Sequence, residues 1–329
     1  MRIFAWLRPD GFTAALLATV ALATLAPLPG AWHAGFAVVT RLAISLVFFL
    51  HGARLKRATV VQGLANWRLH LAVMAATFAL FPLLGLAVAP FVPAAIAPGI
   101  LFLCCLPSTM QASVAFTAIA GGNVAASVCS ASISNLAGVA ITPLLVALVF
   151  GTSGGVTPGA IENIVLTVLL PFGLGQLVHP WLGPFLVRNL RVLGIVDRAS
   201  ILLVVYGAFA DAVAGGLWHE LTPATLAAMA GADALLLALG LAITTWGSRR
   251  LGFSRADEIA IVFCGSKKSL VAGVPMANIL FPSGAGLILL PLMLFHQIQL
   301  MACAMLARRY AGRQATLRAG IEVAAEPAE

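Results

Sequence analysis

The sequence predicts an all-α membrane protein, with ten transmembrane helices in two inverted repeats of five. Hydrophobic residues make up 61% of the 329 residues and charged residues only 9%, with a mean hydropathy of +1.03. A soluble domain of this size carries about 25% charged residues. Two further observations support the fold class: basic residues segregate to one side of the spans, and polar breaks interrupt two of them.

Ten apolar stretches approach or exceed the roughly 20 residues that a helix needs to cross a bilayer. They cover residues 11–29, 34–53, 69–89, 95–120, 124–149, 160–186, 195–216, 222–247, 257–281 and 285–307. The first stretch also resembles a cleaved signal peptide, with arginines before an apolar run. We retain it as a span because the distribution of basic residues requires ten.

Sixteen of the 19 Lys and Arg residues lie before the first span, in every second loop or at the edges of that loop, or after the last span. With ten spans, all sixteen fall on the same side of the membrane. These are Arg2, Arg8, Arg54, Lys56, Arg57, Arg68, Arg188, Arg191, Arg198, Arg249, Arg250, Arg255, Arg308, Arg309, Arg313 and Arg318. Loops rich in Lys and Arg stay in the cytoplasm. The sequence therefore predicts a multi-pass protein of a bacterial-type inner membrane with both termini cytoplasmic. The formal charge of +8 is explained by topology, and we expect no nucleic-acid partner.

The chain divides into residues 1–150, residues 151–310 and a tail, 311–329, that we expect to be cytoplasmic and disordered. Five spans are an odd number, so the second set must be inverted relative to the first. The fourth span contains LPSTMQASVAFTAIAGGN and the ninth contains CGSKKSLVAGVPMAN, each with a Pro or Gly break followed by polar residues. Inverted repeats with interrupted helices are typical of secondary transporters.

Lys267 and Lys268 lie side by side in the ninth span. One charge at the centre of a membrane helix costs about 2.5–3.5 kcal/mol on insertion scales. Adjacent residues point about 100° apart on a helix, so one face cannot shelter both. We predict a helix break at Gly265-Ser266 that turns both ammonium groups toward a polar cavity. The alternative is a snorkelling pair or a short loop.

Other intramembrane charges suggest partners. Asp233, halfway along the eighth span, is the candidate counter-ion for Lys267 or Lys268, either as a fixed salt bridge or as a proton-linked switch. Arg41 and Asp211, on the second and seventh spans, are interpreted as a structural pair.

Polar residues near the two breaks and on the fifth and tenth spans are the candidate substrate-binding set. It comprises Pro107, Ser108, Thr109, Gln111, Ser113, Asn135, Ser266, Lys267, Lys268, Ser269, His296 and Gln297. For any single Ser or Thr, a hydrogen bond to its own helix is the commoner role. Carboxamides are harder to dismiss, because a lipid-facing amide is costly.

LPSTMQASVAF, GGNVAASVCSASISN and Thr142-Pro143 resemble the bile acid:sodium symporter family, and CGSKKSLVAGVPMA resembles its divergent branch similar to sodium/bile acid cotransporter seven. The resemblance covers nearly the whole chain. It implies a panel of spans one, two, six and seven and a core of the other six. It also implies that the broken fourth and ninth helices cross at the binding site, and that panel and core move relative to each other.

The chain departs from the family at the sodium site. On the family pattern, Val262 stands where a glutamate binds sodium and Ser266 where a glutamine does. In the fourth span, Ala112 and Ser113 stand where the family has a serine and an asparagine. Valine offers no side-chain oxygen, so sodium as a cofactor is doubtful. We expect no other cofactor and no metal, and a fixed ammonium could take the electrostatic role of a bound cation.

The sequence contains no complete enzyme motif that we recognise. His219-Glu220 begins an HExxH pattern, but Pro223 stands at the second histidine position. The prediction is a secondary active transporter of a small organic anion that works by alternating access in the lipid bilayer. Two alternatives remain: a non-transporting regulator of membrane ion homeostasis, such as that of calcium, and a cation/proton antiporter-like exchanger with Asp233 as carrier. The oligomeric state stays open.

Overall fold

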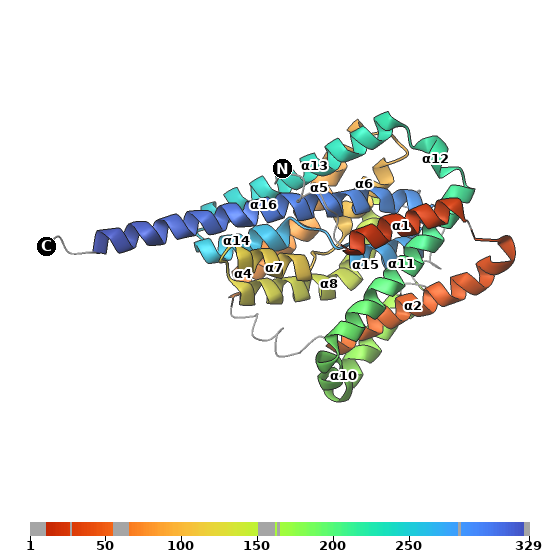
Figure 1. The fold of residues 1–329 in the computed structure, drawn as a ribbon, viewed down its shortest axis with the longest axis horizontal. Helices are drawn as coiled ribbons and strands as arrows, with labels where there is room; N and C mark the ends of the chain where they lie inside the picture. The colour runs from red at the N-terminus through yellow and green to blue at the C-terminus, as the bar shows by residue number, and fades with distance from the viewer. Residues whose placement is uncertain are drawn as a thin grey trace.

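The structure is a computed structural model that describes residues 11–26, 28–54, 66–150, 162, 165–281 and 284–325, and all regular elements in these ranges are helical (Figure 1). Eight helical segments are long and apolar enough to cross a membrane. They are His33–Ala53, Trp67–Phe91, Val124–Phe150, Val165–Leu186, Arg191–Ala214, Pro223–Arg250, Arg255–Leu280 and Ala285–Gly312. The chain is therefore an all-α, multi-pass membrane protein, as its composition predicts.

Two predicted spans are missing from that set for a structural reason. The first is α1 (Gly11–Leu25), which has only 15 helical residues. The fourth is divided into α6 (Ala97–Cys105) and α7 (Gln111–Ile119) of nine residues each. The predicted boundary at residue 151, and the basic residues Arg2, Arg8, Lys56 and Arg57, lie outside the described residues.

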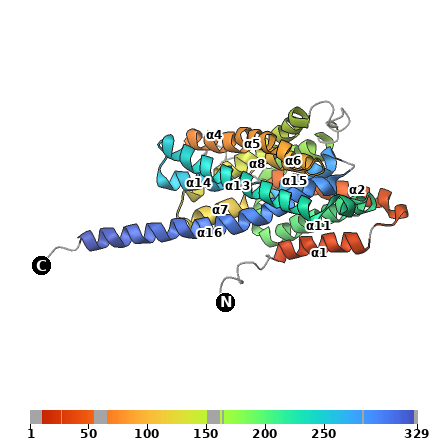
Figure 2. The same cartoon turned by 90° about the horizontal axis from the view of Figure 1, so that it is seen from above.

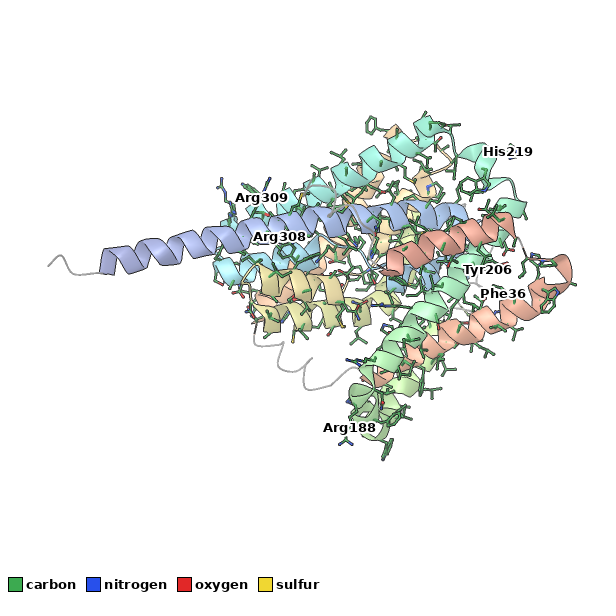
Figure 3. All side chains as sticks on the ribbon, viewed as in Figure 1. Phe36, Arg188, Tyr206, His219, Arg308 and Arg309 are labelled. Carbon is green, nitrogen blue, oxygen red and sulfur yellow. The ribbon has the colours of Figure 1, made fainter. Side chains whose placement is uncertain are left out.

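Four helices form one group of mutually packed elements, which we call the panel. They are α1, α2 (His33–Arg54), α10 (Leu170–Arg188) with the preceding π-helical turn η7 (Val165–Leu169), and α11 (Leu190–Ala214). Two glycines let the backbones of α2 and α10 touch, because a Cβ at Gly52 or Gly175 would overlap a carbonyl of the other helix. Phe36 and Tyr206 join α2 to α11 edge to face, with ring centroids 5.6 Å apart (Figure 3).

The remaining membrane helices form the core, which lies beside the panel in both ribbon views (Figures 1 and 2). They are α4 (Trp67–Ala75), η4 (Ala76–Leu80), α5 (Phe81–Val88), α6, α7, α8 (Val124–Phe150), α13 (Pro223–Arg250), α14 (Arg255–Gly265), α15 (Leu270–Leu280) and α16 (Ala285–Ala325). The short helices η2 (Gly30–Trp32), η5 (Ala89–Phe91) and α12 (Leu217–Glu220) lie in connections. Panel and core meet chiefly where α11 packs on α15 and α16.

Both predicted breaks are present in the core. Leu106 has an extended backbone, as expected for a residue before proline, and the chain resumes as helix only at Gln111. In the second break, α14 ends at Gly265 and α15 begins at Leu270, where the Ser269 hydroxyl accepts from the amide of Ala272 as an N-cap.

The C-terminal region differs from the expected disordered tail. Helix α16 continues to Ala325 and extends well beyond the other helices (Figures 1 and 2). Residues 311–325 contain five alanines and two arginines, which are strong helix formers, and no proline, so the helix that begins in the bilayer can continue through Gly312 and Gly320.

Glu258, only 3% exposed, ties three core helices together at one end. Its carboxylate accepts from Arg249 at 3.0 and 3.1 Å, from Arg255 at 2.6 Å and from the Tyr310 hydroxyl at 3.2 Å. These donors come from α13, α14 and α16. Charge-assisted hydrogen bonds are the stronger kind, and here one carboxylate carries four of them.

We therefore expect Glu258→Gln to destabilise the protein by about 1–3 kcal/mol, because an amide cannot accept all four bonds and presents its own hydrogens to arginines. Thermal unfolding of the detergent-solubilised protein measures the change. Arg250→Gln is the control. Arg250 follows Arg249 at the end of α13, but its guanidinium lies over the Trp246 ring and not against Glu258. Equal melting temperatures for Glu258→Gln and wild type would contradict the assignment.

Candidate functional site at the meeting of two broken helices

The two helix breaks touch each other. The amide of Ser269 in the second break donates to the carbonyl of Pro107 in the first, at 2.9 Å. The Ser113 hydroxyl on α7 donates to the carbonyl of Phe263 on α14, also at 2.9 Å. Segments about 160 residues apart in the sequence therefore share one polar centre inside the core.

Helix α8 satisfies the backbone groups that the first break frees. The amide of Ser108 donates to the Ser134 hydroxyl at 3.1 Å, and Asn135 Nδ2 donates to the carbonyl of Ser108 at 2.9 Å. Thr142 donates to the carbonyl of Cys105 at 2.9 Å. Non-helical backbone is tolerated at membrane depth only where protein or water supplies such partners. Asn135, predicted as a site residue, thus holds the break in place.

Lys268 lies at the centre of this arrangement and is completely buried. Its Nζ donates to three backbone carbonyls, those of Thr77, Cys104 and Leu106, each at 2.8 Å. An ammonium has three donors, so all are used. The Phe81 ring lies 4.5 Å from Nζ and covers the group from another side. The ammonium occupies a carbonyl cage of the kind that could otherwise hold a metal cation.

Gln299 on α16 fixes the backbone of Lys268 and is not among the residues predicted from the sequence. Its Oε1 accepts from the Lys268 amide at 2.9 Å, and its Nε2 donates to the Lys268 carbonyl at 3.0 Å. Nε2 also lies 2.9 Å from Nδ1 of His296, which brings that predicted residue to the site. The available signal was a carboxamide in an apolar helix, the same signal that selected Gln297 two positions earlier.

The side chain of Lys267 points away from that of Lys268, as expected for neighbouring residues. Its Nζ has no hydrogen-bond partner among the described residues and is completely buried. It lies 4.4 Å from the ring centroid of Phe116 and 5.2 Å from that of Phe263. The predicted polar cavity around both lysines is therefore wrong. One ammonium fills a carbonyl cage, and the other lies against two aromatic rings.

Asp233 is not the counter-ion of either lysine. It is completely buried on α13, and neither carboxylate oxygen has a hydrogen-bond partner in the part of the chain that the structure describes. All three donors of the Lys268 ammonium bind carbonyls, which leaves none for a carboxylate. Asp233 is thus a buried acidic group without a charge partner, and burying an ionised carboxylate in this way is costly.

The other predicted residues separate into two sets. Thr109 and Ser113 join each other at 3.0 Å beside the first break, and Ser266 donates back to the carbonyl of Val262 at 2.6 Å. Ser266 thus takes the commoner role of bonding to its own helix. Gln111 is exposed on the first turn of α7, and Gln297 is partly exposed on α16.

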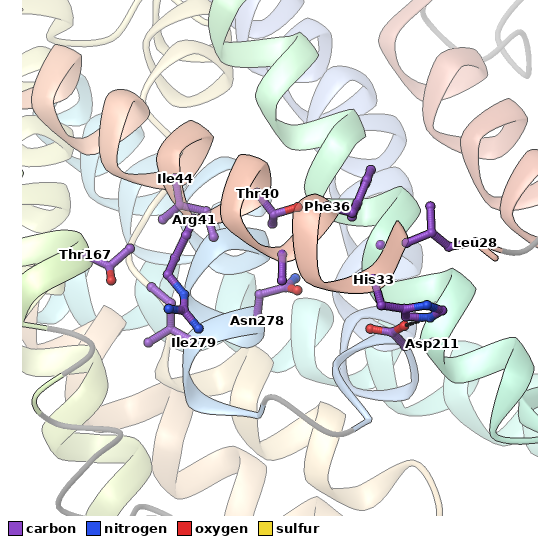
Figure 4. A pocket seen from close by; sticks show the side chains of 12 residues that line it. Leu28, His33, Phe36, Thr40, Arg41, Ile44, Thr167, Asp211, Asn278 and Ile279 are labelled. Atoms are coloured by element: carbon purple, nitrogen blue, oxygen red, sulfur yellow. Dashed lines mark ion pairs between the residues drawn. The ribbon is translucent and has the colours of Figure 1, made fainter. Parts of the chain in front are cut away.

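A pocket of about 200 Å³ opens between the panel and the core (Figure 4). It is lined by Leu28, His33, Phe36, Ala37, Thr40, Arg41 and Ile44 of the first part of the chain, Thr167 of η7, Gly207 and Asp211 of α11, and Asn278 and Ile279 of α15. Since α2 begins at His33 and ends at Arg54, the pocket lies toward the end of the panel helices opposite that arginine.

The charges in this pocket differ from the prediction. Asp211 pairs with His33, with 3.3 Å between Nε2 and Oδ1, so the expected Arg41–Asp211 pair is wrong. His33 lies nearer because α2 starts there, level with the end of α11. Arg41 makes no ion pair or hydrogen bond within the described ranges, and its guanidinium is exposed to the pocket (Figure 4).

The fold and its polar centre define a class: a multi-pass membrane transporter in which two interrupted helices meet inside a core and a second helical group flanks it. The profile of the SBF-like CPA transporter family matches residues 10–312. The chain belongs to this family, and its relatives place it with the bile acid:sodium symporters.

Three relatives illustrate the range of similarity. "Uncharacterized protein PA2026" of Pseudomonas aeruginosa is 55% identical over 93% of this chain and 94% of its own length. "Putative symporter YfeH" of Escherichia coli is 48% identical over the full length of both chains. Sodium/bile acid cotransporter 7-A of Xenopus laevis is 29% identical over 90% of each. The chain is accordingly a transporter and not an enzyme.

The two adjacent lysines allow a matched test of the site. Lys268→Met leaves three buried carbonyls without their donor, which should cost on the order of 3 kcal/mol or more. We expect this to lower the melting temperature in detergent by about 5–10 °C. Lys267→Met removes a buried ammonium that lies against two aromatic rings and has no hydrogen-bond partner in the described part of the chain, so stability should be equal or higher. Equal losses in both variants would contradict the distinct roles of the two lysines.

Proposed function

We propose that this chain is a secondary active transporter of a small organic anion, in which panel and core rearrange to give alternating access. The observation that carries the proposal is Arg41. Its guanidinium faces a pocket at the boundary of panel and core, and the described residues offer it no anionic partner. A guanidinium is planar and binds a carboxylate or phosphate through two parallel hydrogen bonds.

The size and lining of the pocket favour a small substrate. Its volume of about 200 Å³ is below the 300–1,000 Å³ typical of pockets for drug-sized ligands. Thr40 contributes a buried hydroxyl that has no partner among the described residues, and Asn278 contributes a carboxamide from the core side. These groups suit a short-chain carboxylate better than a steroid.

The lysines at the helix breaks supply positive charge further inside. Asn278 lies ten residues beyond Lys268, and the part of that distance on α15, from Leu270 to Asn278, is about 12 Å. In this proposal an anion enters beside Arg41, and Lys267 and Lys268 make the interior ahead of it favourable for negative charge. Ser108, Ser269 and the other break residues would contact the substrate only after the two helix breaks separate.

We propose that Lys268 replaces sodium at the crossing. Its ammonium binds the three carbonyls that would otherwise be free to bind a cation. Asp233 is then the candidate carrier of a coupling proton, since it is buried and lacks a partner in the described part of the chain. The name of the Xenopus laevis relative refers to sodium. In this proposal the present chain would differ from that name by using a proton as its coupling ion.

The finer topology belongs to the same proposal. Adding α1 and the α6–α7 pair to the eight long spans gives ten, with Arg54, Arg188 and Arg249 at one side of the membrane. Ten spans arranged as inverted halves place both termini on that side, the cytoplasmic side of a bacterial-type inner membrane.

Ligand-dependent thermal stability tests the substrate class. The detergent-solubilised protein is heated with a panel of short carboxylates, with and without sodium. An anion present at 100 times its dissociation constant should stabilise by about 2.7 kcal/mol, and Arg41→Gln should abolish that effect. Arg188→Gln is the control, because Arg188 is also exposed on a panel helix but lies far from the pocket (Figure 3).

Three outcomes would overturn parts of this proposal. A requirement for sodium would contradict the role given to Lys268. An anion effect that persists in Arg41→Gln would move the site elsewhere. The absence of any stabilising anion, together with no flux in proteoliposomes, would favour the alternative of a non-transporting regulator.

Asp233→Asn tests the coupling ion separately. The amide keeps the shape of the carboxyl group but cannot bind and release a proton, so we expect anion uptake into proteoliposomes to lose its dependence on a pH gradient. Stability should be unchanged or higher, because no salt bridge is lost. Proton release driven by a cation gradient, without an anion and abolished in Asp233→Asn, would instead support the exchanger alternative.

A further inference from the structure

A second hollow lies on the outer surface of the core, between α13 and α16. Its volume is about 500 Å³. It is lined by Ala238, Leu241, Ala242, Thr245, Trp246 and Arg249 of α13, and by Ala302, Met305, Leu306 and Arg309 of α16. No panel residue contributes to it, so it is separate from the pocket beside Arg41. We call it the α13–α16 groove.

The groove has an apolar length and a basic end. Each helix presents a stripe with helical spacing, and each stripe finishes in an arginine, Arg249 on α13 and Arg309 on α16. From Ala238 to Arg249 the stripe is about 16 Å long, at 1.5 Å per residue. Both helices run in the same direction in Figure 1, so the two arginines lie at the same end of the groove.

The two arginines differ in how much of their hydrogen-bonding capacity is used. Arg249 gives Nε and Nη2 to Glu258 and also interacts with the Tyr310 hydroxyl, so most of its donors are used. Arg309 is exposed and makes no hydrogen bond or ion pair in the described ranges. Trp246 is 62% exposed beside them, and the guanidinium of Arg250 lies 5.3 Å from a Trp246 ring centroid. Exposed tryptophan at the end of a membrane helix is typical of the level of the lipid head groups.

We propose that the α13–α16 groove binds one anionic phospholipid, with its phosphate against Arg309 and Arg249 and an acyl chain along the apolar stripe. Charge complementarity identifies the occupant: basic pockets between membrane helices bind anionic head groups. The apolar stripe, about 16 Å long, matches much of the length of an acyl chain and would contribute nothing to the binding of a free phosphate. The lipid stabilises the core alone, because α13 and α16 both belong to it.

Lipid-dependent stability of the purified full-length chain tests the proposal. The protein in a neutral detergent is titrated with phosphatidylglycerol, with phosphatidylcholine of the same acyl chains, and with soluble glycerol phosphate. We expect stabilisation by phosphatidylglycerol only, with apparent affinity about tenfold weaker in Arg309→Gln, the loss expected for one charge-assisted contact. Arg188→Gln, which removes an exposed arginine on the panel, should bind like wild type.

A second variant keeps the test independent of charge. Ala242 is exposed in the groove, so Ala242→Trp should fill the apolar stripe without disturbing the interior and should also weaken binding. Native mass spectrometry should then show one retained phosphatidylglycerol in wild type and a smaller lipid-bound fraction in both groove variants. This readout is binding alone, so it does not depend on the proposed transport.

Three results would overturn the proposal. Equal stabilisation by phosphatidylcholine would make the groove a general lipid contact without head-group recognition. Stabilisation by glycerol phosphate that depends on Arg309 would show a free phosphate site that does not use the apolar stripe of the groove. Unchanged phosphatidylglycerol binding in both Arg309→Gln and Ala242→Trp would place any bound lipid elsewhere.

Discussion

The core depends on one buried contact, the ammonium of Lys268 among three backbone carbonyls. The two interrupted helices leave carbonyl groups that have no intrahelical partner, and each such group would cost about 1–3 kcal/mol if it were buried alone. Lys268 removes this cost at Cys104, at Leu106 and at Thr77 of η4 with a single charged group. A cation at the C-terminal end of α6 is also favoured by the helix dipole. The contact therefore joins three elements that are distant in sequence, and it explains why a lysine is tolerated in the interior of a membrane protein.

The neighbouring residues are arranged around that contact. Gln299 clamps the backbone of Lys268 through both of its amide atoms, so the side chain enters the cage from a fixed position. Gly138 on α8 faces Pro107 so closely that a Cβ would lie 2.7 Å from the proline ring, and this lets α8 bring its polar side chains to the first break. Small residues thus permit close approach, and close approach lets side chains satisfy the backbone at membrane depth. This is how membrane helices pack in general, because lipid supplies no hydrophobic force between them.

The sequence predicted the helical class, the membrane location and both breaks, because these follow from local properties: hydropathy, Pro107 and adjacent charges. It failed where the partner is not visible as a side chain type. Asp233 is the counter-ion that side-chain charge predicts, whereas the partners of Lys268 are backbone carbonyls that every residue possesses. The choice of Asp211 for Arg41 failed in a similar way, since His33 competes for the carboxylate and only the start of α2 determines which is nearer. Gln299 and Gln297 differ only in which face of α16 they lie on. Because α16 is apolar on all sides, its sequence does not show which face points toward the site.

A covalently attached cation differs from a bound one in its consequences for transport. A sodium ion that binds at a crossing brings gradient energy and leaves at the other side, whereas the Lys268 ammonium stays in the protein throughout the cycle. In the proposed function such a group would attract a negative substrate in both conformations, but its own position could not report the direction of an ion gradient. Any coupling must therefore enter through another group. Asp233 is a buried carboxyl group in the same core, without a partner in the described part of the chain, and it differs from Lys268 in having nothing that fixes its charge. If the proposed function holds, the separation of the Lys268 ammonium from a carboxyl group without a described partner would be the physical basis for transport without sodium.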